Sequence, residues 1–141
     1  MTNGVNRSEL ETDLAGITLP TPIGMAAGFD KDCKILGSIL KLGFGFVTGG
    51  TVTIASRPGN PKPRMIRLPD MKAVMNSMGF PGQGLEPALR RLGKAQKYKD
   101  RVLISIAGTI EDEIFECLRR TQTHVAGIEL NISSPNTTGL R

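Results

Sequence analysis

Residues Pro22–Gly50 read PIGMAAGFDKDCKILGSILKLGFGFVTGG, and this pattern predicts a strand, a helix and a second strand. The run Pro22–Ala27 is apolar, Cys33–Leu42 has helical spacing, and Phe44–Thr48 is apolar again. The apolar residues of the helix are Ile35, Ile39 and Leu42. Gly43 lies where a glycine commonly ends a helix. Because no hairpin turn separates the two apolar runs, they are expected to pair in parallel through a right-handed crossover.

The same alternation resumes in the second half of the chain. The periodicity predicts helices over Gly84–Tyr98 and Ile110–Arg120, and it predicts strands over Val102–Ala107 and Ala126–Ile132. The apolar residues of these two helices are Leu85, Ala88, Leu89 and Leu92 in the first and Ile114, Phe115 and Leu118 in the second. Four strands alternating with three helices predict α/β architecture with a parallel sheet.

Residues 51–80 interrupt this alternation. The segment contains four prolines, Pro58, Pro61, Pro63 and Pro69, which confine it to loop or edge structure. A segment of this length inside a compact domain usually serves a function.

The length of the chain limits how much of an α/β fold it can hold. A (β/α)8 barrel typically needs about 250 residues, and this chain has 141. We therefore expect residues 1–141 to form part of a single domain that contains about the first four β/α units. Such a chain is either a piece of a larger enzyme or is completed by pairing with another polypeptide.

Charge and composition restrict the possible partners and location. The net charge of +5 permits binding to phosphates, anionic substrates or nucleic acid. The densest basic cluster, which consists of Arg90, Arg91, Lys94, Lys97, Lys99 and Arg101, is interpreted as a solvated helix face, and no nucleic-acid partner is expected. Cys33 and Cys117 have no partner at metal-ligand or redox spacing, which predicts a reduced chain without a metal site. Without a signal peptide or a run of about 18 apolar residues, we expect a cytoplasmic protein, or one bound peripherally to the cytoplasmic face of the membrane.

The loops after the predicted strands are where a parallel α/β fold binds its ligands. Lys31 in the first loop suits a carboxylate or an electron-rich ring, and the polar set Asn131–Thr137 suits the edge of a polar heterocycle. Each feature also has a structural interpretation. In this interpretation Asp30 and Asp32 cap the first helix, Ser133 and Ser134 are N-caps, and Lys31 is an ordinary solvent-facing lysine. The single histidine, His124, precedes the last strand, where a structural role is favoured over catalysis.

Four motifs in order along the chain carry a family resemblance. They are PIGMAAGFDKD (Pro22–Asp32), GTVT with RPGNPKPRMIRL (Gly50–Thr53 and Arg57–Leu68), MNSMGF (Met75–Phe80) and NISSPNTTGLR (Asn131–Arg141). Together they resemble the dihydroorotate dehydrogenases, which are FMN-dependent enzymes of pyrimidine biosynthesis. The resemblance implies a (β/α)8 TIM barrel with FMN at its carboxyl-terminal mouth, which oxidises dihydroorotate to orotate.

The resemblance also implies roles for individual residues. Ala26, Ala27 and Gly28 would lie against the flavin ring, Thr51 would hydrogen-bond to the flavin, and Asn131 would also contact it. Lys31 would bind the substrate carboxylate. The pyrimidine pocket would be formed by Asn76, Met78, Gly79, Phe80, Asn131 and Asn136, so that residues 51–80 are an excursion that builds the substrate pocket. Ser134 would be the base that takes a proton from C5 while a hydride passes from C6 to flavin N5.

The electron acceptor stays open between quinone, fumarate and NAD. Ser134 resembles the quinone-linked branch of the family, whereas the soluble branch generally has Cys there, and Ser105–Gly108 is more similar to the soluble branch. The family's second half supplies the FMN phosphate site, so we expect the 141 residues alone to bind FMN weakly and to be inactive. Two other interpretations are a related FMN-dependent pyrimidine reductase and a non-catalytic half-barrel that associates with itself or with a companion chain.

Overall fold

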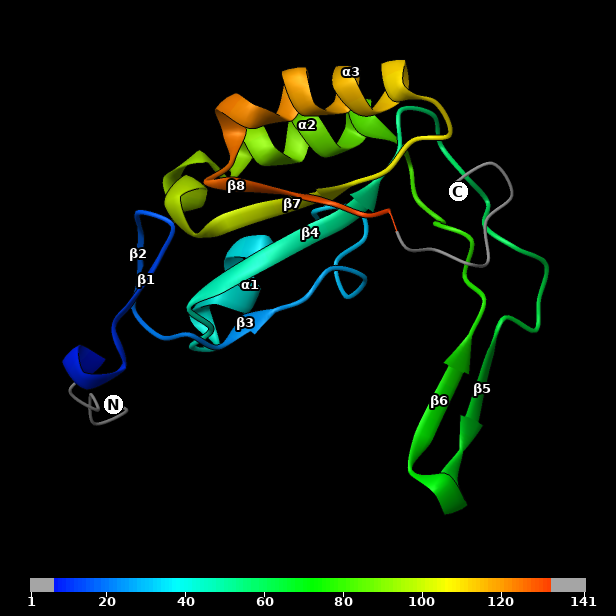
Figure 1. The fold of residues 1–141 in the computed structure, drawn as a ribbon, viewed down its shortest axis with the longest axis horizontal. Coiled ribbons are helices and arrows are strands. Elements are labelled where there is room, and N and C mark those ends of the chain that lie inside the picture. Colours follow the sequence, from blue (N-terminus) through cyan, green and yellow to red (C-terminus); the bar gives the residue numbers. More distant parts are fainter. Residues whose placement is uncertain (1–6, 133–141) are drawn as a thin grey trace.

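The computed structural model describes residues 7–132, and its centre is a four-stranded parallel sheet (Figure 1). The strands lie in the order β3 (Gly24–Met25), β4 (Phe46–Val52), β7 (Val102–Ile106) and β8 (Gly127–Leu130). This confirms the predicted α/β architecture with a parallel sheet. Each strand of this sheet pairs with the next one along the chain, and every pair is parallel, as predicted for the first pair.

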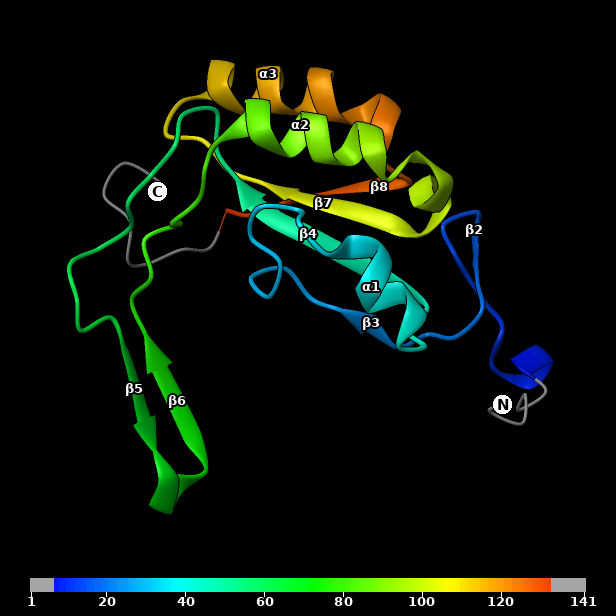
Figure 2. The same ribbon diagram turned by 180° about the vertical axis from the view of Figure 1, so that it is seen from behind.

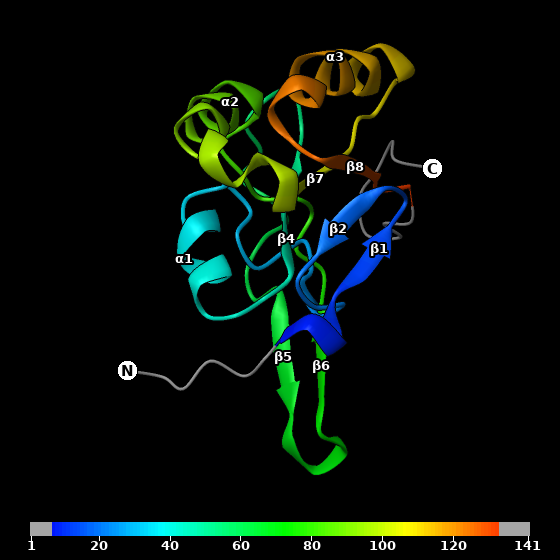
Figure 3. The same cartoon turned by 90° about the vertical axis from the view of Figure 1, so that its left-hand side faces the viewer.

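Within residues 7–132, three α-helices lie on one side of this sheet (Figures 2 and 3). They are α1 (Leu36–Lys41), α2 (Leu85–Lys94) and α3 (Glu111–Thr121). Four short 3-10 segments accompany them, at η1 (Arg7–Leu10), η2 (Pro69–Met71), η3 (Gln96–Arg101) and η4 (Gln122–His124). The predicted helix over Gly84–Tyr98 is therefore divided, since its regular part ends at Lys94 and a 3-10 turn follows.

Helix α1 is shorter than the spacing predicts, and a different set of its side chains is buried. The predicted helix begins at Cys33, but Cys33 has a φ of +59°, outside the right-handed helical region. Leu36, Ile39 and Leu40 are buried, whereas Ile35 and Leu42 are exposed. The loop before the helix is held by Asp30, so the chain turns into the helix only after residue 35.

The core lies between the sheet and the helices. Its members include Val47 of β4, Ile104 of β7 and Leu92 of α2. The predicted core face of α2 is confirmed, because Leu85, Ala88 and Leu92 are buried and Leu89 packs against them. Of the apolar residues named for α3, Ile114 packs against the core, whereas Phe115 is 63% exposed and Leu118 is 38% exposed. Cys117 and Thr121 are buried on this helix instead.

Two antiparallel hairpins flank the parallel sheet. Strands β1 (Thr12–Leu14) and β2 (Ile17–Leu19) form a hairpin that the sequence did not predict. Its turn contains Ala15 and Gly16 with positive φ, and Asp13 accepts a hydrogen bond from the Gly16 N–H (3.0 Å). Strands β5 (Met65–Leu68) and β6 (Ala73–Asn76) form the second hairpin, inside the predicted loop-or-edge segment, and it projects away from the sheet (Figure 1).

Candidate active site

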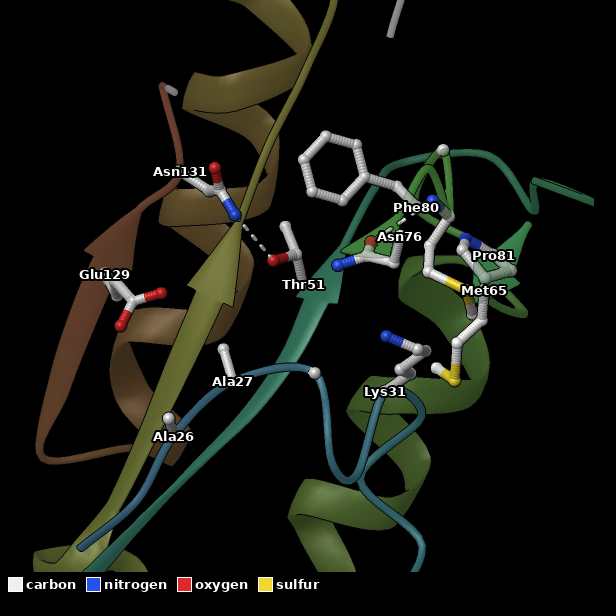
Figure 4. A pocket seen from close by; sticks show the side chains of 13 residues that line it. Ala26, Ala27, Lys31, Thr51, Met65, Asn76, Phe80, Pro81, Glu129 and Asn131 are labelled. Carbon is white, nitrogen blue, oxygen red and sulfur yellow. Dashed lines mark hydrogen bonds between the residues drawn. The ribbon is translucent and has the colours of Figure 1, made fainter. Parts of the chain in front are cut away.

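A hollow of about 480 Å³ lies at the carboxyl edge of the parallel sheet. The loop that follows β3 and the carboxyl ends of β4 and β8 meet the base of the β5–β6 hairpin there (Figure 4). The lining residues are Ala26, Ala27, Gly28, Lys31, Thr51, Met65, Asn76, Met78, Gly79, Phe80, Pro81, Glu129 and Asn131. Every predicted site residue within the described part of the chain is among them. Ser134 and Asn136 lie outside the described residues.

The loop after β3 places Lys31 at the rim of the hollow. The buried carboxylate of Asp30 accepts hydrogen bonds from the backbone N–H groups of Lys34 (2.8 Å) and Ile35 (2.7 Å). The carbonyl oxygen of Asp30 accepts a third bond, from the N–H of Gly50 on β4 (3.0 Å). These bonds hold the backbone beside Lys31, whose ammonium group points into the hollow (Figure 4). The interpretation of Asp30 or Asp32 as a cap of the first helix was wrong, because the N-cap of α1 is Ile35 and has no side-chain cap hydrogen bond. Asp30 instead stabilises the turn that precedes α1.

One wall of the hollow is made of small residues. Ala26 and Ala27 each contribute one side-chain carbon, and Gly28, with a φ of +99°, contributes none. The Gly28 N–H donates to the carbonyl oxygen of Gly50 (2.8 Å), so this wall is fixed to β4. A Cβ added at Gly28 would lie 3.7 Å from the Nζ of Lys31. A flat ligand can therefore approach the backbone beside the ammonium group.

A polar chain joins three neighbouring strands at the hollow. The Asn131 side-chain amide donates to the Thr51 hydroxyl (3.0 Å), which is hydrogen-bonded to the hydroxyl of Ser105 (2.9 Å). Thr51 and Ser105 are buried. The backbone N–H of Asn131 donates to the carbonyl oxygen of Ile106 (2.9 Å), which extends the pairing of β7 and β8 to this residue. The amide of Asn131 is therefore held in one orientation at the edge of the hollow.

The base of the β5–β6 hairpin closes the other side. Met65 and Asn76 are cross-strand partners at that base, so both line the hollow. The Asn60 N–H donates to the carbonyl oxygen of Met78 (3.0 Å). Gly79 has a φ of +70°, and a Cβ there would lie 2.4 Å from the side-chain oxygen of Asn60. Only glycine fits this turn without displacing Asn60.

The lining carries one cationic and one anionic side chain among the described residues. Lys31 and Glu129 lie on opposite sides of the hollow (Figure 4). Burial lowers the pKa of the Lys31 ammonium group, the charge of Arg64 lowers it further, and the charge of Asp32 opposes this shift. A ligand carboxylate beside Lys31 would favour its charged form.

Three lining residues were not predicted, namely Met65, Pro81 and Glu129. Glu129 lies two residues before Asn131, and the period of two in a strand places both on the same face. That signal was available in the sequence. Met65 reaches the hollow only because it pairs with Asn76 in the hairpin, and no local pattern indicates this pairing.

The other residues considered for chemistry lie elsewhere. His124 precedes β8 and its Nδ1 is 3.1 Å from the side-chain nitrogen of Gln96. Burial raises the pKa of Cys33 to about 12 and that of Cys117 to about 11, so both thiols stay protonated near neutral pH. Within residues 7–132, three or more metal-binding side chains never gather at one place, and no helix has the length and apolar character to cross a membrane.

The fold and the hollow define a class of protein: a parallel α/β protein whose candidate ligand site lies at the carboxyl edge of its strands. The sequence profile of dihydroorotate dehydrogenase matches residues 9–141, and the chain belongs to this family.

Curated relatives and solved structures agree with this. The chain is 40% identical to a dihydroorotate dehydrogenase (quinone) of Pseudomonas fluorescens, over 95% of this chain and 41% of the relative. It is 43% identical to one of Azorhizobium caulinodans, over 94% of this chain and 39% of the relative. A ligand-free type DHODH from Eimeria tenella superposes with a TM-score of 0.89 at 37% identity, covering 99% of this chain and 43% of the other. The complex of Eimeria tenella DHODH with ferulenol gives a TM-score of 0.87 at 39% identity, over 94% of this chain and 39% of the other. The chain thus spans about two fifths of the length of the proteins it matches.

Proposed function

We propose that the protein containing this chain oxidises dihydroorotate to orotate with FMN as cofactor. The observation that supports this most is that Lys31, Asn76, Thr51 and Asn131, which are far apart in the sequence, line one hollow. A cation, two amides and a hydroxyl match a ligand that has a carboxylate and a pyrimidine ring. Membership of the dihydroorotate dehydrogenase family supports the same reaction.

We also propose that the sheet is the first half of a (β/α)8 barrel. Its strands follow one another in chain order and its three helices share one side, as in such a barrel. In this proposal residues 1–141 belong to one domain, and residues 51–80 form the excursion that builds the substrate pocket.

The wall of small residues would hold the cofactor. Ala26, Ala27 and Gly28 would lie against the flavin ring, and the fixed amide of Asn131 and the hydroxyl of Thr51 would bond its polar edge. Bound FMN would supply the acceptor for a hydride from C6 of dihydroorotate. The chain's own contribution is to orient the ring and to exclude water from one face of it.

The substrate would lie between Lys31 and the amides. The ammonium group of Lys31 would bind the carboxylate, and Asn76, Asn131 and Asn136 would bind the polar edge of the pyrimidine. Met78, Gly79 and Phe80 would complete the pocket from the hairpin side. Ser134 would take the proton from C5. Because a free hydroxyl is a poor base near neutral pH, its own proton would have to leave through water or other hydroxyl groups in the same event.

Quinone is the electron acceptor that the comparisons favour, because the curated relatives at about 40% identity are named for it. A serine at position 134 supports the same assignment by resemblance. Reduction of a water-soluble quinone by the full-length protein, with no reduction of fumarate or NAD, would test it.

Substitution of Lys31 tests the proposed contact with the substrate carboxylate, and substitution of the nearby Lys34 is the control. In the full-length protein, Lys31→Ala should weaken orotate binding about 10- to 100-fold, since a charge-assisted hydrogen bond contributes roughly 1.5–3 kcal/mol. Lys34→Ala is the matched control, because Lys34 pairs with Asp32 (3.2 Å) outside this hollow. Flavin content and orotate affinity are both read from the absorbance spectrum. Equal loss of orotate affinity in both variants, or loss of flavin in Lys31→Ala, would contradict the proposed contact.

Ser134→Ala tests the base. Dihydroorotate oxidation should fall by about 100-fold or more, as expected when a general base is removed, while flavin content and orotate binding stay unchanged. Near wild-type turnover would refute the role of Ser134.

A further inference from the structure

A second hollow, of about 290 Å³, lies between α1 and the adjoining α2–η3 segment. Helices α1 and α2 are neighbours on the same side of the sheet in two views (Figures 2 and 3). Five cationic side chains line this hollow, namely Lys34, Lys41, Arg91, Lys94 and Lys97. None of its lining residues in the described part of the chain is acidic. We call it the basic hollow.

The floor of the basic hollow is built by a close contact between its two walls. A Cβ at Gly37 of α1 would lie 2.4 Å from Cε2 of Tyr98 in η3, so the absence of a side chain admits the ring. The ammonium nitrogen of Lys97 lies 5.0 Å from the centre of the same ring, within cation–π range. The hollow is therefore a packed feature of the fold and not only a gap between two helices.

The cations differ in how far their charge is neutralised. Lys34 pairs with Asp32 (3.2 Å), and Arg91 donates to the carbonyl oxygen of Asp32 (2.9 Å). Within residues 7–132, Lys41, Lys94 and Lys97 form no ion pair. Like charges that converge on a concave surface concentrate the positive potential there, and an anion with several charges relieves their repulsion.

We propose that the basic hollow binds a ligand that carries two or more phosphate charges. Phosphate oxygens accept hydrogen bonds from several ammonium groups at once, and Ser38 adds a hydroxyl to the lining. The ligand is either a soluble polyphosphate or nucleotide, or the headgroup of an anionic lipid, since both present the same chemistry. The site lies apart from the candidate active site and shares no lining residue with it.

The test compares two variants that lose the same charge from the same elements. Lys94→Gln/Lys97→Gln removes one cation of the basic hollow from α2 and one from η3. Arg90→Gln/Lys99→Gln removes one cation from α2 and one from η3 that lie outside the hollow. Binding of sodium tripolyphosphate to the full-length protein is measured by titration calorimetry, and binding to vesicles that contain cardiolipin, whose headgroup carries two phosphates, is measured by co-sedimentation. Thermal unfolding checks that both variants fold.

Each result decides the proposal. Tripolyphosphate binding at a ratio of one to one, weakened about 5- to 30-fold in Lys94→Gln/Lys97→Gln and less than about twofold in the control, supports a soluble phosphate ligand. The same contrast seen only with vesicles supports a lipid headgroup. If neither probe binds, the proposal is overturned. Equal loss of binding in the two variants also overturns it, because net charge alone then explains the binding.

A second measurement does not depend on substitution. Acetylation of lysines by a limiting reagent is followed by mass spectrometry with and without the bound probe. Protection of Lys94 and Lys97 with unchanged acetylation of Lys99 supports the site, and equal protection of all three contradicts it.

Discussion

Asp30 and Asp32 stand two residues apart in one motif and have different structural roles. Asp30 is 5% exposed and stabilises the turn that leads into α1, with both carboxylate oxygens accepting hydrogen bonds from backbone N–H groups. Asp32 lies nearer the surface, accepts the Gln83 N–H (2.8 Å) and pairs with Lys34. The loop that carries Lys31 is therefore held on one side by the hydrogen bonds of Asp30 and on the other side by the hydrogen bond and ion pair of Asp32.

The hydrogen bonds of the Asp30 carboxylate predict a loss of stability on substitution. Asp30→Ala should lower the free energy of unfolding by about 1–3 kcal/mol, because two N–H groups lose their acceptors. Asp30→Asn keeps one acceptor oxygen and should lie between wild type and Asp30→Ala. Asp100→Ala, on the surface in η3, should change stability by less than about 0.5 kcal/mol. Urea unfolding measures all three, and equal values for the two alanine variants would refute this role of Asp30.

Lys31 predicts a pH dependence of ligand binding. Only the protonated ammonium group attracts a carboxylate, so orotate affinity should be constant at low pH and fall as pH rises through the pKa of Lys31. Burial, helped by Arg64, lowers this pKa from its ordinary value of 10.5, so the fall begins at a lower pH than for an exposed lysine. Orotate titrations across the alkaline range measure it. Lys31→Arg should remove the fall, because arginine stays charged; an identical profile in this variant would assign the pH dependence to another group.

At the scale of elements, two glycines, Gly93 and Gly45, differ in whether the structure has room for a side chain at their position. Gly93 lies inside α2, and a Cβ there would meet nothing within 4 Å. Gly45 precedes β4, and a Cβ there would lie 1.9 Å from the carbonyl oxygen of Thr21. The first position is open helix surface, and the second is a contact between two backbones.

This contrast gives a matched pair of variants. Gly93→Ala should raise the free energy of unfolding by about 0.5–1 kcal/mol, because alanine restricts the unfolded chain and favours the helix. Gly45→Ala should destabilise the protein by about 1–3 kcal/mol, since the backbone must move to admit the methyl group. Chemical unfolding of both variants checks the signs, and a destabilising Gly93→Ala would show that the surface of α2 is covered.

At the scale of the whole molecule, the sheet has two unpaired edges within residues 7–132, at β3 and at β8. Leu130 on β8 is 49% exposed and Ile132 just after it is 73% exposed. Unpaired backbone groups beside exposed apolar side chains favour association with another chain. These edges are where the remaining strands of a barrel would pair.

A polypeptide limited to these 141 residues should therefore self-associate in a concentration-dependent way. Leu130→Lys should shift it toward the monomer by placing a charge at the β8 edge. Leu42→Lys changes a residue that is 79% exposed at the end of α1, a helix that packs on β4, and should leave association through the β8 edge unchanged. Light scattering after gel filtration measures the mass. A monomeric wild-type polypeptide would contradict this expectation.

Much of this organisation follows from local patterns. The alternation of apolar runs predicted all four parallel strands and three helices, with errors at their ends. Helical spacing did not identify the buried side chains of α1 and α3, where Ile35, Leu42 and Phe115 are exposed, because the packing of each helix on the sheet selects the buried side chains. The β1–β2 hairpin was missed because its signal is a short turn at Ala15 and Gly16. The motifs predicted the described lining of the hollow except for Met65, which cross-strand pairing brings there, Glu129, which lies two residues before Asn131, and Pro81, which follows Phe80.

The sequence by itself determined the parallel α/β class of fold and the family, because apolar periodicity and sequence motifs are properties of the chain. Only the tertiary structure decided which of the predicted site residues meet. The hydrogen bond from Asn131 to Thr51 spans 80 positions and exists because β4, β7 and β8 are neighbours in register. The basic hollow likewise needs Gly37 against Tyr98, two residues on separate segments. Such contacts form only when separate helices and strands pack against one another, so the sequence of one segment alone does not determine them.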